Sequence, residues 1–238
     1  MTTLPDQIIL YDDSCPMCKL YTSGFVKLDM LKEEHRMGFS CTPAHIREQI
    51  DQDRGRHEIP LYDRSTGQTH YGLDALFLIL GSKWRMLKPL LRRSWFRALL
   101  YPLYQLITYN RRQIAGSRPP ETGFDCAPDF HLGYRLLYLF LAIGSAILML
   151  LGIASKVYLG GEFLLFKSIW IFALLGFGGF LGSLWGKNRW DMAGNTATAL
   201  LMGTAVVWLS SLIGQEMVWI GLGLGTLLLL REWKRRLW

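Results

Sequence analysis

The sequence predicts an α/β domain over residues 1–131, followed by an all-α membrane region of four helices over residues 132–238. The distribution of charge indicates this division. Charged and apolar residues are mixed up to His131, and charges become rare from Leu132 to Leu230. A segment of about a hundred residues with so few charges has no polar face to turn toward water. We therefore expect the chain to pass from water into lipid near residues 130–133.

Four transmembrane spans are predicted from the apolar stretches, at about 133–154, 163–185, 192–214 and 215–231. The fourth is short, because the apolar run Met217–Leu230 does not by itself have the length needed to cross a bilayer. It requires neighbouring residues as part of the span. Glycines at a spacing of four predict close approach of helices in lipid. They are Gly178, Gly182, Gly186, Gly221 and Gly225. No Asp, Glu or His falls in the middle of a span, which argues against a transporter.

Basic residues predict the orientation of these spans. Lys187 and Arg189 lie between the second and third spans, and four bases follow the last span in residues 231–236. The positive-inside rule places that loop, the tail and the first domain in the cytoplasm. Residues 1–7 lack the basic start of a secretory signal, which agrees with this placement. We expect an integral protein of a bacterial inner membrane with its α/β domain in the cytoplasm.

The net charge of +7 arises largely from two basic stretches, residues 83–112 and 231–236. Bases alternate there with Trp, Tyr and Leu, and nucleic acid is one reading of such a pattern. Both stretches flank apolar spans, so anionic lipid headgroups are the simpler partner. We expect the lipid bilayer, and no nucleic acid, as a partner. Residues 94–109 are too short to span a bilayer and are interrupted by Pro102, so we expect this helix to pack under the sheet rather than lie at the interface.

A pair of cysteines follows the first predicted strand. The apolar run Gln7–Tyr11 ends in turn-forming residues, and Cys15-Pro16-Met17-Cys18 then opens a helix whose apolar residues recur at helical spacing. Unpaired N–H groups and the positive end of the helix dipole lower the pKa of a cysteine in this position from about 8.5. We therefore expect Cys15 to be the nucleophile of a disulfide exchange and Cys18, one turn later, to be the resolving thiol.

Other readings of the cysteine pair stay open. A structural disulfide is disfavoured in the cytoplasm, where thiols stay reduced. A zinc or copper site needs further ligands, and the remaining cysteines and histidines show no paired spacing. They are Cys41, Cys126, His35, His45 and His57. We assign no metal ligands, expect Cys41 to be a small buried residue of a strand, and retain Cys126 as a candidate electron relay to Cys15.

Downstream elements predict the order βαβαββα. They are a strand at 36–41, a helix at 44–51, a hairpin of strands 58–63 and 69–72, a helix at 73–80 and a helical extension over about 82–131. A dithiol after the first strand of this order predicts a thioredoxin-like fold. Pro60 opens the third strand, where such a fold carries a cis-proline facing the dithiol, so we expect a cis bond before Pro60.

At this point the chain resembles the DCC family of predicted thiol-disulfide oxidoreductases, whose signature is Asp-x-x-Cys-x-x-Cys after the first strand. Asp12, Cys15 and Cys18 fit that signature, and the stretches 72–76 and 104–111 also resemble the family. The resemblance covers about residues 8–116. One departure is Asp13, where the family usually has glycine; Asp tolerates the left-handed turn that a glycine allows.

The resemblance implies an enzyme that exchanges disulfides with a protein or a small thiol and needs no cofactor besides its cysteine pair. The predicted spans would anchor this enzyme in a membrane. The Cys-Pro-x-Cys pattern also occurs in glutaredoxins, which makes glutathione a candidate substrate. Cys15, Cys18, Asp12 and Pro60 would be catalytic, and substrate would contact three further residues. These are Pro16, Met17 and Ile59. Asp12 either accepts the Cys18 proton or serves as a turn residue. The alternative function is a non-enzymatic module that binds metal or senses redox state.

Overall fold

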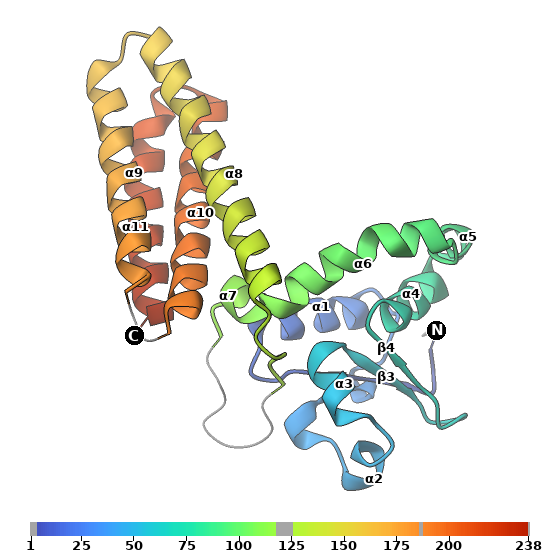
Figure 1. Ribbon diagram of the computed structural model, residues 1–238. Helices are drawn as coiled ribbons and strands as arrows, with labels where there is room; N and C mark the ends of the chain where they lie inside the picture. The colour runs from blue at the N-terminus through green and yellow to red at the C-terminus, as the bar shows by residue number, and fades with distance from the viewer. Residues whose placement is uncertain (1–3, 118–125, 186–187, 238) are drawn as a thin grey trace. The chain divides into compact units, whose positions relative to one another are not determined.

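The computed structural model describes residues 4–117, 126–185 and 188–237. The chain divides into two compact units, Met1–His131 and Leu132–Trp238. The first unit contains a small sheet covered by helices, and the second consists of helices alone (Figure 1).

The sheet of the first unit has four short strands and mixed polarity. The strands are β1 (Gln7–Tyr11), β2 (Arg36–Gly38), β3 (Pro60–Asp63) and β4 (Thr69–Tyr71). Their order across the sheet is β2-β1-β3-β4. Strand β1 runs parallel to β2 and antiparallel to β3, and β3 runs antiparallel to β4. The central position of β1 follows from its apolar run, which is buried on both faces of the sheet.

Seven α-helices and three short 3₁₀ turns complete the described part of this unit. The α-helices are α1 (Pro16–Lys27), α2 (Ala44–Arg47), α3 (Gln52–His57), α4 (Gly72–Lys83), α5 (Lys88–Leu91), α6 (Ser94–Tyr109) and α7 (Arg111–Ala115). The 3₁₀ turns are η1 (Glu33–His35), η2 (Phe39–Cys41) and η3 (Arg85–Leu87). The predicted order of strands and helices is present, with α3 as an additional helix. Asp51 starts α3 by accepting a hydrogen bond from the Arg54 N–H.

Two apolar clusters pack on opposite faces of the sheet. Alternate residues of β1 point to opposite faces, so Ile8 joins a cluster with Phe39 and with Ile46 of α2. Ile9 joins the second cluster, with Ile79 of α4 among its members. Helix α2 therefore covers one face of the sheet and α4 the other.

The predicted strand over residues 36–41 ends early, which changes the environment of Cys41. Strand β2 stops at Gly38 and the chain turns into η2, with Phe39 facing the core and Cys41 facing solvent. Cys41 is therefore exposed, and the expectation of a buried residue was wrong. The turn hydrogen bond from the Thr42 N–H to the Phe39 carbonyl replaces the ladder bond that a longer strand would have made.

Helix α6 is present with Pro102 inside it, and only one of its apolar faces packs as predicted. Phe96 lies on the inner face, where its ring stacks on Phe77 of α4 with centroids 6.2 Å apart. Leu106 is buried further along the helix. Trp95 and Leu99 are exposed instead. The expectation that the whole helix packs under the sheet therefore holds for one face only.

The second unit consists of four helices. They are α8 (Leu132–Leu159), α9 (Phe163–Ser183), α10 (Arg189–Ile213) and α11 (Met217–Leu237). Helices α8, α9 and α10 are long and apolar enough to cross a membrane. Helix α11 is the predicted fourth span, but it does not join them, because its last turns carry Arg231, Glu232, Lys234 and Arg235. Length and composition therefore support three of the four predicted spans, namely α8, α9 and α10.

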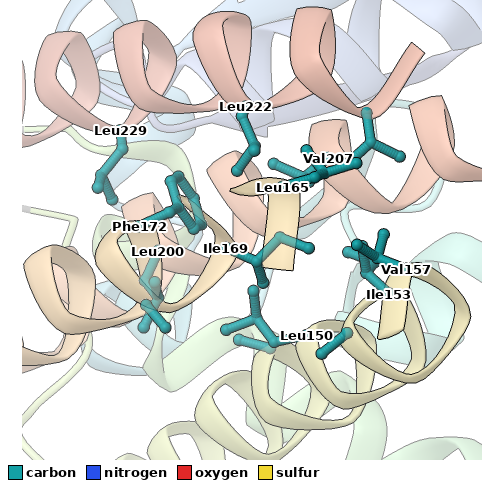
Figure 2. Close-up of a cluster of buried hydrophobic side chains, with 14 of the residues drawn as sticks. Leu150, Ile153, Val157, Leu165, Ile169, Phe172, Leu200, Val207, Leu222 and Leu229 are labelled. Carbon is teal, nitrogen blue, oxygen red and sulfur yellow. The ribbon is translucent and has the colours of Figure 1, made fainter. Parts of the chain in front are cut away.

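Apolar side chains from all four helices form the core of this unit, as Figure 2 shows. Leu150 from α8, Ile169 from α9, Leu200 from α10 and Leu222 from α11 are among its members. Near one end of the bundle, Arg135 at the start of α8 pairs with Asp191 at the start of α10, with Nη2 and Oδ1 3.1 Å apart. The charges of this unit thus gather near helix ends and leave the centre apolar.

Only some of the predicted glycines bring helices together. A Cβ atom on Gly225 of α11 would lie 2.7 Å from the carbonyl oxygen of Gly203 in α10, and one on Gly221 would meet Ser210. Nothing lies within 4 Å of such an atom on Gly178 or Gly182. The prediction of close packing is therefore confirmed for α11 and wrong for these two glycines of α9. Gly186 lies outside the described residues.

Candidate active site

The two cysteines lie where β1 passes into α1, as the sequence predicts. Cys15 has an extended backbone (φ −97°, ψ 111°) and immediately precedes Pro16, the first residue of the helix. Its N–H donates to the Asp12 carbonyl at 3.1 Å, and its carbonyl accepts the first helical bond from Lys19 at 3.1 Å. Cys18 is in the first turn of the helix. Both thiols are free.

Contacts between the two thiols shift their pKa values in opposite directions. The Cys18 thiol donates a hydrogen bond to the Cys15 sulfur and so favours the Cys15 thiolate; burial opposes this, while the Cys18 amide and the Arg111 charge support it. The net result lowers the pKa of Cys15 from 9.0 to about 7. Because the same hydrogen bond holds the Cys18 proton, and Cys18 is itself buried, the pKa of Cys18 is raised. Cys15 is therefore the better nucleophile, and Cys18 retains its proton.

A buried arginine contributes to this electrostatic environment. Arg111, the first residue of α7, places Nη2 3.2 Å from Oδ2 of Asp12, with side chains 12% and 5% exposed. Burial acts to lower the pKa of Arg111, but the charges of Cys18, Asp12 and Cys15 outweigh it and raise that pKa. Arg111 therefore remains a cation beside both sulfurs, and its charge favours the Cys15 thiolate.

Asp12 shapes the loop that presents the dithiol. Its Oδ1 accepts hydrogen bonds from the Ser14 N–H at 2.9 Å and from the Ser14 hydroxyl at 2.6 Å, while Oδ2 faces Arg111. The turn role considered for Asp12 is thus present. Asp13, which stands at the glycine position of the resemblance, does not take the expected left-handed conformation: Asp29 is the one non-glycine residue with positive φ among those described. Asp13 instead accepts a hydrogen bond from Ser40.

A small cavity of about 10 Å³ lies beside Cys18, and a volume of this size holds about one water molecule. Its lining includes Asp12, Ile59, Pro60 and Arg111. The structure therefore brings three of the predicted site residues, namely Asp12, Ile59 and Pro60, to the resolving cysteine.

Pro60 is buried and opens β3, but the bond before it is not the cis bond that we expected. No cis peptide bond occurs among the described residues. In the trans form both backbone groups of Ile59 are used: its N–H donates to the Tyr104 hydroxyl at 3.3 Å, and its carbonyl accepts from Gly72 at 3.0 Å. The ordinary isomer therefore satisfies the local hydrogen bonds.

The residues expected to contact substrate differ in accessibility. Pro16 is exposed, whereas Met17 and Ile59 are half-buried. The sulfurs themselves are covered, since Cys15 is 0% and Cys18 3% exposed. A substrate that approaches the motif therefore meets Pro16 and Met17 first, and the neighbouring side chains must move before it reaches the Cys15 sulfur.

Two functional candidates were missed by reasoning on residue types. Tyr21, one turn after Cys18, hydrogen-bonds the Cys18 sulfur, and burial raises the pKa of its phenol well above the ordinary value. The sequence marks Tyr21 only as an apolar position of α1. The sequence places Arg111 in the basic stretch 83–112 and in the family resemblance, and nothing local links it to cysteines almost a hundred residues earlier. Cys126 is buried and lines the same small cavity as Cys18.

Within the described ranges, no three Cys, His, Asp or Glu side chains gather closely enough to hold a metal ion. No family model matches the chain, no curated protein is significantly similar to it in sequence, and no solved structure is significantly similar to it in fold. The resemblance to the DCC family therefore rests on the residues quoted for it.

Proposed function

We propose that the protein is a membrane-anchored thiol-disulfide oxidoreductase of the DCC type. One observation carries this proposal: two thiols one turn apart at a helix start have opposed pKa shifts, with the pKa of Cys15 at about 7 and that of Cys18 raised. With such a pKa about half of Cys15 is thiolate at neutral pH, and the thiolate is the form that attacks a disulfide.

The arrangement of the first unit supports a thioredoxin-like domain. The strand order β2-β1-β3-β4, with β1 parallel to β2, places the dithiol after a central strand. Pro60 opens β3 and lines the cavity beside Cys18, which supports its comparison with the proline of a thioredoxin-like fold. The trans bond before Pro60 distinguishes this chain from the usual form of the fold.

The proposed reaction has two steps. The Cys15 thiolate attacks one sulfur of a disulfide R–S–S–R′, so that a Cys15–S–S–R bond forms and R′–S⁻ leaves and takes up a proton. Cys18 then loses its proton and attacks the Cys15 sulfur, which releases R–S⁻ and leaves a Cys15–Cys18 disulfide. The substrate gains two electrons and the dithiol loses two. Turnover therefore requires a thiol donor that returns two electrons to the pair.

The second step needs an acceptor for the Cys18 proton. Asp12 is the proposed acceptor, because it lines the same cavity as Cys18 and the cavity has room for about one water. Arg111 holds the Asp12 carboxylate in place through their ion pair. After the proton leaves, the same guanidinium stabilises the Cys18 thiolate that attacks Cys15.

The burial of both sulfurs bears on the class of substrate. A small disulfide such as glutathione disulfide needs less displacement of side chains than a folded protein does, so we propose a glutathione-like or flexible peptide disulfide as the substrate. The apolar helices α8, α9 and α10 would anchor this activity in a bilayer, with the apolar residues 217–230 of α11 as a fourth, shorter span. The positive-inside rule would then place the dithiol in the cytoplasm of a bacterial cell.

Cysteine variants of the purified full-length protein test the proposal. Cys15→Ser should abolish reduction of glutathione disulfide, and Cys18→Ser should accumulate mixed disulfides that mass spectrometry detects at Cys15. Cys41→Ser is the matched control, because Cys41 is exposed outside the site and its loss should leave the rate unchanged. If neither Cys15→Ser nor Cys18→Ser changes turnover or trapping, the protein is not this enzyme.

A redox-sensing module is the second candidate, and the full burial of Cys15 favours it. A sensor needs to form one disulfide on oxidation rather than to turn over rapidly, and a covered sulfur limits exchange with bulky partners. A single oxidation by a small disulfide without catalytic turnover would support this reading. Stoichiometric zinc or copper that is lost in Cys15→Ser would instead favour the metal-binding form of the alternative.

A further inference from the structure

Helix α6 carries an apolar stripe that faces outward. Trp95, Leu99, Leu103 and Ile107 follow one another at a spacing of four and are 60%, 64%, 51% and 40% exposed. Residues four apart lie on the same face of a helix, so these side chains form one continuous line about 18 Å long. Phe96, the residue after Trp95, instead packs on α4, where its ring stacks on Phe77. An exposed apolar line of this length marks a contact surface.

A basic groove adjoins the start of this stripe. It has a volume of about 770 Å³ and lies between α4, α5 and the first turn of α6. Its basic lining residues are Arg85, Lys88, Arg92, Arg93 and Arg97. The one acidic residue in the lining, Asp74, is paired with Arg97 at 2.6 Å.

The remaining basic residues of the groove have no acidic partner among the residues that the structure describes. Within the described ranges, Arg85, Lys88, Arg92 and Arg93 take part in no ion pair. The sequence also contains no Asp or Glu from Ala75 to Pro120. This face of the unit therefore has a strong positive potential, which favours an anionic partner.

We propose that this surface of α6 and the groove lies in the headgroup layer of the membrane, with the outward stripe in the acyl boundary and the groove on anionic phospholipid headgroups. An apolar stripe with a Trp, next to clustered Lys and Arg, is the pattern of a helix that lies in a membrane interface. The chain also contains three helices that are able to span a bilayer, so a membrane lies within its reach. This proposal does not depend on the chemistry of the dithiol.

Spin-label depth measurements on the full chain in lipid nanodiscs test the proposal. A nitroxide on Leu99→Cys reports the stripe, and one on Glu48→Cys is the control, because Glu48 is exposed at the end of α2 on the opposite face of the sheet. Both changes are made in a Cys41→Ser chain, and the signal of that parent is subtracted. For each label we compare the accessibility to oxygen with the accessibility to a water-soluble nickel chelate. In discs of phosphatidylglycerol we expect this ratio to be several-fold higher at position 99 than at position 48.

A second arm tests the headgroups. Replacing Lys88, Arg92 and Arg93 together by Ala, or phosphatidylglycerol by phosphatidylcholine, should raise access of the nickel chelate to position 99 several-fold. If position 99 is as open to nickel as position 48, the stripe faces water and the proposal fails. If both reagents are excluded from position 99, another protein surface covers it and the proposal also fails. Unchanged depth in the triple variant and in the neutral lipid would refute the role of anionic headgroups.

Discussion

Nη2 of Arg111 lies 3.2 Å from Oδ2 of Asp12, and both side chains are largely shielded from solvent. Their charges act on the thiols of Cys15 and Cys18. This ion pair joins the first residue of α7 to the loop after β1. The two charges act on the sulfurs in opposite senses, since Arg111 lowers and Asp12 raises the pKa of Cys15. The balance of these two side chains therefore tunes the nucleophile of the proposed reaction.

Removing the positive charge should make Cys15 a weaker acid. In Arg111→Gln we expect the pKa of Cys15 to rise, because the nearby guanidinium charge favours the thiolate. The pH dependence of alkylation by iodoacetamide measures the shift. Arg111→Lys keeps the charge and should restore most of the original value. An unaltered pKa in Arg111→Gln would show that the guanidinium has no part in activation.

The stability of the reduced protein should depend on Cys15 between pH 7 and pH 9. The folded pKa of about 7 lies below the value of 9.0 taken for the unfolded chain, so the thiolate stabilises the fold above pH 9 and this contribution is lost as the pH falls through 7. Two pKa units correspond to about 2–3 kcal/mol. Above pH 9 the raised pKa of Cys18 acts against folding, because only the unfolded chain then ionises that thiol.

Thermal unfolding of the reduced full-length protein and of Cys15→Ser measures this contribution. The wild-type midpoint should fall by several degrees relative to that of Cys15→Ser on going from pH 9 to pH 7. Cys41→Ser should follow the wild type, because its thiol is exposed and outside the site. Parallel curves for the wild type and Cys15→Ser would mean that the Cys15 pKa is not lowered by folding.

Close packing of α10 and α11 should be sensitive to one added methyl group. In Gly203→Ala the new Cβ would lie 2.9 Å from the carbonyl oxygen of Gly225, so the helices must separate, and we expect a loss of about 1–3 kcal/mol in stability. Gly178→Ala is the control, because nothing lies within 4 Å of its added atom. Thermal denaturation in detergent compares the two. Equal stability of both variants would contradict this packing.

The proposed topology can be read with an impermeant thiol reagent on intact cells. Cys41 is exposed in the first unit and should resist labelling until the membrane is permeabilised, since we place that unit in the cytoplasm. A cysteine in place of Glu162, exposed in the turn between α8 and α9, should label from outside. Labelling of Cys41 in intact cells would mean that the first unit lies outside the cytoplasm, which would contradict the proposed orientation.

The local pattern of the sequence predicts the site well where neighbouring residues decide the structure. An apolar run, turn-forming residues and Pro16 together specify a strand that passes into a helix with Cys15 at its start. The pattern fails where no apolar period exists, as in α3, whose residues from Gln52 to His57 are polar or glycine. The local pattern also predicted a strand over residues 36–41, whereas β2 ends at Gly38 and residues 39–41 form a 3₁₀ turn.

Other features depend on tertiary contacts that a local pattern does not contain. The proximity of Arg111 to the dithiol arises from the packing of α7 beside α1, and the choice of glycines at helix contacts depends on how each helix is rotated. Helix α6 has two apolar faces, and periodicity alone does not say which one the protein covers. The hydrogen bonds of Ile59 with Tyr104 and Gly72, which accompany the trans bond before Pro60, are likewise absent from the local pattern.

The central claim is that folding activates Cys15 and protects Cys18. Alkylation of the reduced full-length protein as a function of pH, read for each cysteine by mass spectrometry, tests it most directly. We predict modification of Cys15 with a midpoint near pH 7, while Cys18 remains unmodified through pH 9. Modification of both cysteines together with a midpoint near pH 9, or faster modification of Cys18, would contradict the claim.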